Sequence, residues 1–113
     1  MARKDKVERP TKKSEYEILF ASRQAEKGWT DLKATTRNAL VDSWDFLTRT
    51  PLVEGSLNYP LKGAYGTVTY GGREYTRWQH KPTSQGDARI WFFVIDQVVY
   101  LENVHTHHPN ETK

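Results

Sequence analysis

The sequence contains no cysteine and no hydrophobic run long enough to cross a membrane. The absence of cysteine excludes a disulfide framework and cysteine-ligated zinc, so packing alone must hold the fold together. The longest apolar run, residues 90–95, is far shorter than the ~18 residues that a membrane span needs. The charged N-terminus is not followed by the apolar stretch of a secretion signal. We therefore expect a cytoplasmic protein that does not contact a membrane.

Positive charge is concentrated at the start of the chain. The 113 residues carry a formal net charge of +3, yet residues 1–13 alone contribute +4, so the remaining hundred residues sum to −1. Residues 1–14 have no periodicity and contain Pro10, and we expect them to form a disordered basic tail. Such a tail is suited to contact the phosphates of a nucleic acid, although a solvated terminus without a partner explains the same charges.

A strand and two helices are predicted in the first half of the chain. Residues 15–20 alternate polar and large apolar side chains, which is typical of a strand, and Ser22 is suited to cap a helix. A second helix is predicted to begin at Thr35 or Thr36 and to end before Pro51, because proline disfavours helical geometry in the residue before it. The predicted buried stripes are Ala25, Trp29 and Leu32 in the first helix, and Leu40, Val41, Trp44 and Leu47 in the second.

Glycines and polar loops divide the second half of the chain into two predicted β-hairpins. After a loop over residues 52–63, the predicted strands span residues 64–70, 73–80, 88–95 and 98–104. Gly71-Gly72 between the first two strands is typical of a two-residue turn, and Asp96-Gln97 is predicted to close the second hairpin.

The second hairpin has two chemically different faces, because successive strand residues point to opposite sides. One face is wholly apolar and suited to pack on the helices: Ile90, Phe92, Val94, Val99 and Leu101. The other face carries Arg89, Trp91, Phe93, Tyr100 and Glu102. An arginine and a carboxylate among aromatic side chains are unusual on a face that only covers a core, so we interpret this face as functional.

The order of a strand, two helices and then an antiparallel sheet resembles the RelE/ParE toxin superfamily. Two stretches carry the resemblance: Ala-x-Lys-x-Trp-x-x-Leu-x-x-Thr-x-Arg-x-x-Leu over residues 25–40, and Gly-x-x-Arg-Ile from Gly86, followed by an apolar run and a turn. The resemblance implies an α+β fold with an N-terminal strand and a helical hairpin packed on a twisted antiparallel sheet of four to five strands. It implies a single domain over residues 15–113.

Members of this superfamily are the toxin halves of type II toxin–antitoxin pairs. The RelE-like branch cuts mRNA in the ribosomal decoding site, whereas the ParE-like branch poisons DNA gyrase without cutting nucleic acid itself. The resemblance thus implies a cognate antitoxin as partner in a toxin–antitoxin hetero-oligomer, and ribosome and mRNA as targets in the RelE-like case, with no cofactor. Histidines near the C-terminus favour the RelE-like branch. A non-catalytic RNA-binding relative is the third hypothesis.

RNA cleavage without a metal ion needs a base for the 2′-hydroxyl, an acid for the leaving 5′-oxygen and a cation beside the phosphorus. Histidine suits the first two roles, because its pKa of ~6.5 allows both protonation states near neutrality. Arginine suits the third through its permanent charge and forked donors. Arg89 is similar in position to the central arginine of the superfamily, so the resemblance assigns it to the phosphate. A surface ion pair with Asp87 or Glu102 is the alternative.

Three of the four histidines lie within four residues at the end of the last predicted strand: His105, His107 and His108. His107 is similar in position to the C-terminal catalytic residue of RelE-like toxins, and His108 is the other candidate because strand register can slip by one residue. A terminus that contains histidines without a catalytic role is the alternative. His80, at the end of its predicted strand, could supply the second proton-transfer group. The spacing His-x-His-His does not easily direct three rings at one ion, so we expect no metal site.

The further candidates for contact with RNA are Arg73, Arg77, Lys81, Trp91 and Lys113. The first three lie on or beside the strand that carries essential basic residues in several members of the superfamily. Lys113 falls where some members keep a functional C-terminal residue. Trp91 and Trp78 could stack on bases of single-stranded RNA, with packing in the core as the alternative for each. Trp29 and Trp44 lie on the helical stripes and are predicted to be core residues.

Overall fold

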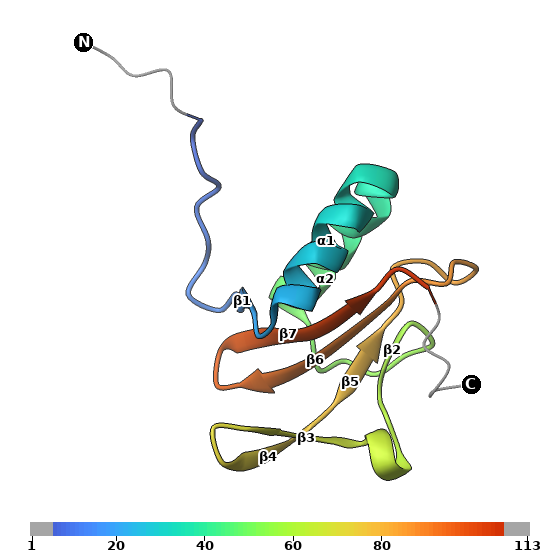
Figure 1. Ribbon diagram of the computed structural model, residues 1–113. Helices are drawn as coiled ribbons and strands as arrows, with labels where there is room; N and C mark the ends of the chain where they lie inside the picture. The colour runs from blue at the N-terminus through green and yellow to red at the C-terminus, as the bar shows by residue number, and fades with distance from the viewer. Residues whose placement is uncertain (1–5, 108–113) are drawn as a thin grey trace.

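The computed structural model describes residues 6–107, which form two helices packed on a five-stranded sheet, with a smaller two-stranded sheet on the other side (Figure 1). The elements in chain order are β1 (Glu17–Phe20), α1 (Arg23–Thr35), α2 (Arg37–Arg49), β2 (Asn58–Pro60), the short 3-10 helix η1 (Gly63–Tyr65), β3 (Thr67–Tyr70), β4 (Arg73–Thr76), β5 (Trp78–His80), β6 (Arg89–Ile95) and β7 (Val98–His105). The α+β class and the helical hairpin are confirmed.

The five-stranded sheet has the order β1-β7-β6-β5-β2 and is mixed. β1 runs parallel to β7, while the other neighbouring strands are antiparallel. The direction of β1 is a detail that the sequence did not reveal, because side-chain alternation identifies a strand without fixing the direction of its neighbour. β2 lies inside the stretch predicted as a loop, and its three residues are too few to show a strand pattern.

The predicted helix boundaries are confirmed. The Ser22 hydroxyl accepts a hydrogen bond from the backbone N–H of Ala25 at 3.0 Å and so caps α1. Thr36 lies between α1 and α2, and α2 ends two residues before Pro51. The helix-facing core contains Ala25, Leu32, Leu40, Leu47, Ile90, Phe92, Val99, Leu101 and Val104.

Gly28 allows α1 to lie unusually close to β7. A Cβ atom added to Gly28 would lie 2.0 Å from the carbonyl oxygen of Val104 and 2.8 Å from its Cβ. No side chain larger than hydrogen fits this approach. Gly28 therefore sets the distance between helix and strand directly beside His105.

The buried stripe predicted for the second helix is only half right. Leu40 and Leu47 are buried, but Val41 is 51% exposed and Trp44 is 39% exposed. The reason is that α2 directs its i, i+7 pair at the sheet, whereas Val41 and Trp44 line a groove of about 210 Å³ between the two helices. Trp44 packs edge-on against Trp29 there, with ring centroids 6.0 Å apart.

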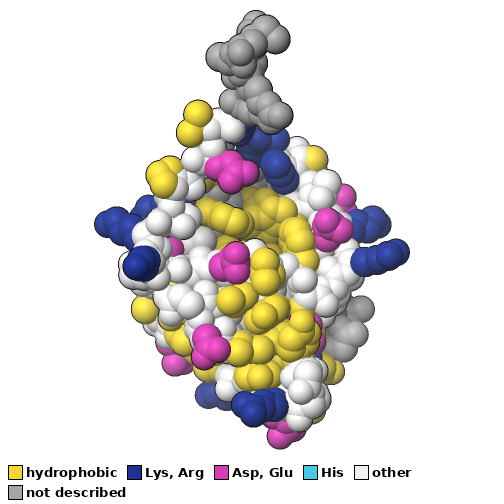
Figure 2. Space-filling view, turned by 90° about the vertical axis from the view of Figure 1, so that its left-hand side faces the viewer, with side chains coloured by type: hydrophobic (Ala, Val, Ile, Leu, Met, Phe, Trp, Pro, Cys, Tyr) yellow, Lys and Arg dark blue, Asp and Glu magenta, His cyan; other side chains and the backbone are white. Residues whose placement is uncertain are grey.

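Hydrophobic side chains also gather elsewhere on the surface. On the side of the molecule from which the N-terminal segment extends, they form a broad band with lysines and arginines along its margins (Figure 2). The described residues 6–14 are mostly exposed and contain no helix or strand, although the Arg9 guanidinium pairs with Glu15 at 2.7 Å. Residues 1–5 of the predicted tail lie outside the described residues, and its contact with RNA stays a prediction. No helix within residues 6–107 is long and apolar enough to cross a membrane.

The first predicted hairpin is correct at its turn, but both of its predicted strands differ from the structure. The first, predicted over residues 64–70, begins only at Thr67, because Gly63–Tyr65 form η1. Gly71 and Gly72 have φ values of 60° and 80°, as a two-residue hairpin turn with two left-handed positions requires. The predicted strand 73–80 breaks at Arg77 into β4, which pairs with β3, and β5, which joins the main sheet. The break arises because β3 and β4 cross over to cover the sheet face opposite the helices, where Tyr70 and Tyr75 contact Phe93.

The second hairpin has the predicted turn and faces, with one irregularity. Phe92 pairs with Leu101 and Phe93 pairs with Tyr100, as side-chain alternation requires. The register then shifts between Trp91 and Phe92, so that Glu102 has no partner on β6 and Trp91 pairs with Asn103. This β-bulge reverses the alternation in the rest of β7.

Candidate functional site

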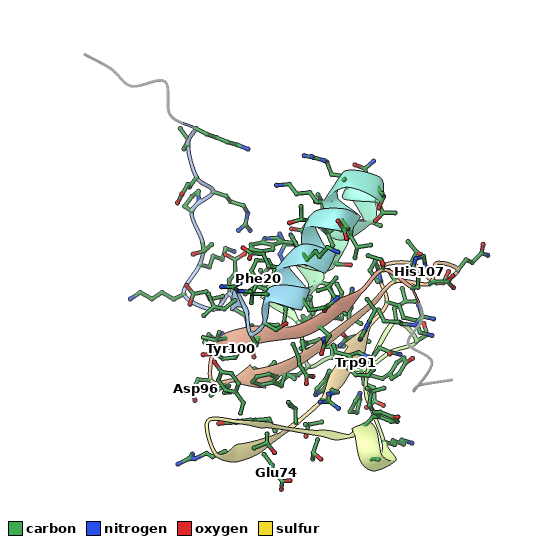
Figure 3. The ribbon with its side chains drawn as sticks, viewed as in Figure 1. Phe20, Glu74, Trp91, Asp96, Tyr100 and His107 are labelled. Carbon is green, nitrogen blue, oxygen red and sulfur yellow. The ribbon has the colours of Figure 1, made fainter. Side chains whose placement is uncertain are left out.

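The candidate site lies on the open face, which we define as the face of the five-stranded sheet turned away from α1 and α2. At one end of this face β6 begins and β7 ends, so Arg89 and His105 are cross-strand partners. Figure 3 shows Trp91 and His107 at this end of the molecule, whereas Asp96 and Tyr100 lie at the other end.

Arg89 is a buried cation, with 7% of its surface exposed. Its NH1 group donates to the carbonyl oxygens of Gly86 at 2.9 Å and Ala88 at 2.8 Å. Within residues 6–107, Nε of Arg89 has no hydrogen-bond partner and no carboxylate forms an ion pair with the side chain. The alternative of a surface ion pair with Asp87 or Glu102 is therefore not what the structure contains. A buried charge without a counter-ion is costly, and its presence needs an explanation.

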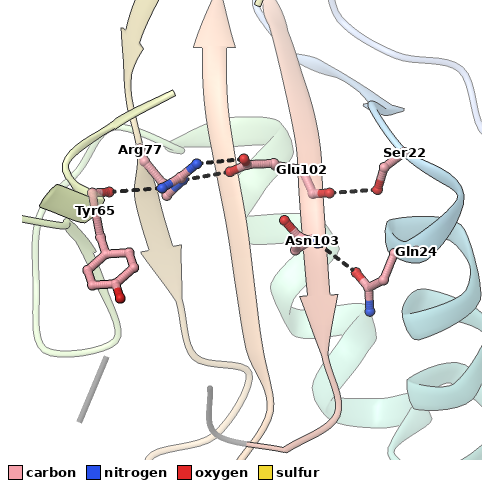
Figure 4. Close-up of polar contacts among 6 residues, drawn as sticks. All are labelled: Ser22, Gln24, Tyr65, Arg77, Glu102 and Asn103. Atoms are coloured by element: carbon pink, nitrogen blue, oxygen red, sulfur yellow. Dashed lines mark hydrogen bonds and ion pairs between the residues drawn. The ribbon is translucent and has the colours of Figure 1, made fainter. Parts of the chain in front are cut away.

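Arg77 lies on the same face and differs from Arg89 in being fully engaged. Its Nε and NH2 groups each donate to one carboxylate oxygen of Glu102, both at 2.7 Å, and NH1 donates to the carbonyl of Tyr65 at 3.4 Å (Figure 4). The guanidinium carbon also lies 5.1 Å from the ring centroid of Trp91. A phosphate would have to compete with Glu102 for these donors, so contact between Arg77 and RNA stays a prediction.

Trp91 packs into the open face rather than projecting from it. Its indole N–H donates to Oε1 of Gln79 at 2.9 Å, and the amide of Gln79 donates to the hydroxyl of Tyr59 at 2.8 Å. The ring meets His105 edge-on, with centroids 4.7 Å apart. With 7% of its surface exposed, Trp91 has the packing role that the sequence left open as an alternative, and stacking on a base would require its neighbours to move.

His107 is exposed and lies two residues after the end of β7. It lines a pocket of about 350 Å³ between the C-terminal end of α1 and the loop that precedes β6. Gly86 and Ala88, whose carbonyls hold Arg89, line the same pocket. His107 and Arg89 are therefore brought to one end of the sheet from positions eighteen residues apart in the sequence.

His80 lies on the opposite face of the sheet, beneath α2, and is not brought together with Arg89. It is 5% exposed, and its ring nitrogens lie 3.1 Å from Oδ1 of Asn58 and 2.9 Å from the Ser43 hydroxyl. Burial lowers the pKa of His80 to about 4, so the ring is neutral near neutral pH. Phe46 stacks on it at 5.3 Å between centroids.

The hydrogen bonds of Asn58 fix the tautomer of His80. The Asn58 amide donates to the carbonyls of Pro51 at 2.9 Å and Val53 at 3.0 Å, which leaves its Oδ1 as an acceptor. Nδ1 of His80 must then carry the proton, and Nε2 accepts from Ser43. This network joins α2, β5, β2 and the loop before β2, so His80 has a structural role. A direct part of His80 in proton transfer stays a prediction, and the buried position of the ring does not support it.

The other predicted residues are scattered or lie outside the described part. Arg73 is exposed next to the Gly71-Gly72 turn, near Tyr70, which packs on Tyr100 at the far end of the open face. Lys81 follows β5, with its Nζ 5.5 Å from the ring centroid of Tyr59. His108 and Lys113 lie outside the described residues. Within residues 6–107, no three His, Asp or Glu side chains lie close enough together to hold a metal ion.

Solved bacterial toxins share this architecture at low sequence identity. The Staphylococcus aureus YoeB dimer superposes with a TM-score of 0.58 and 15% identity, covering 82% of this chain and 98% of YoeB. YafQ in the Escherichia coli DinJ–YafQ complex gives a TM-score of 0.55 and 17% identity over 81% of this chain and 93% of YafQ. A copper-bound mutant toxin from Helicobacter pylori gives a TM-score of 0.57 and 13% identity over 81% of this chain and 94% of that toxin. The chain has the RelE-like toxin fold.

No family model and no curated protein sequence matches the chain. The RelE-like fold is therefore shown by the similarity of the structures and not by the sequence. The expected resemblance is confirmed at the level of fold. Two of these RelE-like toxins were solved with partner proteins: YoeB in a heterotetrameric toxin–antitoxin complex with YefM, and YafQ in a complex with DinJ.

Two features of the candidate site were not predicted from the sequence. The bulge at Glu102 places His105, rather than Val104, on the face of Arg89. The side chain of Gln24 binds the backbone of Val104 at the edge of β7, where β1 has already ended. Neither the bulge nor the Gln24 contact has a sequence signal, because both depend on which residues pair across the sheet.

Proposed function

We propose that this chain is the toxin of a type II toxin–antitoxin system and an endoribonuclease that cleaves mRNA on the ribosome without a metal ion. The observation that carries the proposal is Arg89, a buried and permanently charged side chain without a carboxylate partner among the described residues. A phosphodiester of RNA is the anion that complements it.

Arg89 would stabilise the charge that develops at the phosphorus during cleavage. Its backbone begins β6 in the middle of the sheet, and two carbonyls hold its NH1 group, so the guanidinium is fixed before the substrate arrives. A fixed cation that needs no reorganisation is the most effective kind of transition-state stabiliser.

His107 would supply a proton-transfer group, with His108 as its neighbour in the chain. His107 is exposed at the same end of the sheet as Arg89, where a bound RNA could reach both side chains. Arg73, Lys81 and Lys113 remain candidates for contacts to more distant phosphates.

A cognate antitoxin would be the physiological partner. YoeB and YafQ, whose fold this chain shares, were both solved in complexes with such partners. We propose that the antitoxin of this chain blocks access to the open face.

The test is primer extension on an mRNA in a translation system supplied with the wild-type chain, Arg89→Ala or Arg23→Ala. Arg23 is an exposed arginine at the start of α1 and serves as the matched control. The wild type and Arg23→Ala should cut the mRNA, and Arg89→Ala should cut at least ~100-fold more slowly. Absence of cuts with the wild type, together with gyrase-linked DNA breaks, would instead identify a ParE-like toxin.

A further inference from the structure

We propose that His105 is the general base of the reaction, and that the β-bulge at Glu102 is the device that presents it beside Arg89. The inference rests on the proposed ribonuclease function. It adds a catalytic residue that neither the strand pattern nor the resemblance identifies.

The bulge decides which residue faces Arg89. Without it, uninterrupted pairing from the Phe92–Leu101 pair would set Val104 opposite Arg89 and turn His105 to the helix side. With it, Arg89 pairs with His105, and Val104 is fully buried in the helix-facing core. Bulges commonly redirect side chains next to active sites.

Hydrogen bonds hold the bulge at the edge facing α1. The Ser22 hydroxyl donates to the carbonyl of Glu102 at 2.6 Å. The Gln24 amide donates to the carbonyl of Val104 at 2.8 Å and accepts from its N–H at 2.9 Å, and it also accepts from the Asn103 amide at 3.2 Å. Figure 4 shows Ser22 and Gln24 on this side of β7 and Arg77 on the other.

The Arg77–Glu102 ion pair holds the bulge on the open face. Both donors of this bidentate contact lie 2.7 Å from the carboxylate oxygens of the one residue that has no partner on β6. Arg77 thereby neutralises the partly buried carboxylate of Glu102, the bulged residue. The distorted backbone of β7 is therefore held from the α1 side by Ser22 and Gln24 and from the open face by Arg77. A distortion with this many dedicated contacts is a built feature of the site.

The ring of His105 is oriented by a buried indole. Trp91 meets it edge-on at 4.7 Å between centroids, and the Trp91 N–H is itself held by Gln79. Among the described residues, the charged side chains on the same face as His105 include Arg89 on β6 and the mutually neutralised Arg77–Glu102 pair. Arg89, a cation without a carboxylate partner among residues 6–107, stabilises the oxyanion that forms when the 2′-hydroxyl gives its proton to His105, which suits His105 to act as the base.

In the proposed step, the imidazole of His105 accepts the proton of the 2′-hydroxyl. The 2′-oxygen forms a bond to phosphorus, and the bond between phosphorus and the 5′-oxygen breaks. His107 donates a proton to that 5′-oxygen, so the products are a 2′,3′-cyclic phosphate and a 5′-hydroxyl. Arg89 stabilises the phosphorane between the two transfers.

The experiment compares the full-length wild type with His105→Gln, His105→Phe and His107→Gln on mRNA-programmed ribosomes. Cleavage rate, ribosome binding and thermal unfolding are measured for each chain. His105→Phe keeps an aromatic ring against Trp91 without a proton acceptor, so it preserves the fold if the glutamine variant does not. Both His105 variants should cleave at least ~100-fold more slowly while binding ribosomes as the wild type does.

The outcomes separate the inference from the proposed function. If the wild type cuts and both His105 variants cut at its rate, His105 is not the base and the inference is wrong, while the ribonuclease function stands. If the wild type does not cut mRNA, the proposed function itself fails. Loss of cleavage in His105→Phe, with a melting temperature and ribosome binding like those of the wild type, supports the inference.

Discussion

His80 and Arg89 are two buried ionisable side chains on neighbouring strands, and they differ in almost everything else. His80 pairs across the strands with Ile90, one residue from Arg89, yet it points to the helix face while Arg89 points to the open face. Both ring nitrogens of His80 have partners and its lowered pKa lets it stay neutral. Arginine cannot discard its charge, and Arg89 has no counter-ion among the described residues. The complete pairing of His80 is what a residue that builds the fold requires, whereas we propose that the charge of Arg89 is kept for a ligand.

The largest effect that we predict comes from the helix face. Gly28→Ala should lower the free energy of unfolding by about 3 kcal/mol, because the new methyl group meets the carbonyl of Val104. The matched control is Gly55→Ala, where an added Cβ meets nothing within 4 Å. Chemical denaturation of both variants measures the difference. Equal stabilities would show that α1 can move away from β7 at little cost.

Acid should weaken the helix face through His80. The unfolded chain binds a proton at His80 near the ordinary pKa of 6.5, while the folded chain resists it down to about 4, so stability present above pH 6.5 is lost as pH falls toward 4. This residue should cost about 2 kcal/mol between roughly pH 7.5 and pH 5. His80→Gln should remove that part of the pH dependence, as denaturation at both pH values can measure. An unchanged pH dependence in the variant would contradict the assignment of a neutral, buried ring.

A smaller loss of stability is expected from a substitution of Arg77, the arginine of the open face that pairs with Glu102. Arg77→Met should lower the free energy of unfolding by about 1.5 kcal/mol, because it leaves the partly buried carboxylate of Glu102 without its partner. The double variant Arg77→Met/Glu102→Leu should recover most of this loss. A double-mutant cycle by denaturation measures the coupling, and additive losses would mean that the ion pair contributes nothing to the bulge.

Local patterns predicted the elements of this fold well. The Ser22 cap, the helix end before Pro51 and the Gly71-Gly72 turn each depend on a few neighbouring residues, and all three are confirmed. The apolar face of the second hairpin is also confirmed up to Leu101, because alternation within one strand needs no knowledge of its partner.

The parts that were not predicted depend on contacts between distant segments. Trp44 is exposed because α2 turns toward α1 rather than wholly toward the sheet, and no periodicity within α2 reveals that rotation. The placement of His80 on the helix face and of His105 on the open face depends on strand register and on the bulge. A candidate site assembled from residue types alone therefore combined histidines that the sheet separates.

Arg89→Met is the most direct test of the claim that Arg89 serves a ligand rather than the fold. Its free energy of unfolding and its mRNA cleavage on ribosomes should be measured side by side with those of the wild type. We expect cleavage to be lost while stability is unchanged or higher, because an apolar side chain of similar length would replace a buried charge that has no counter-ion among the described residues. A variant that is less stable by more than about 2 kcal/mol and still cleaves mRNA would contradict it.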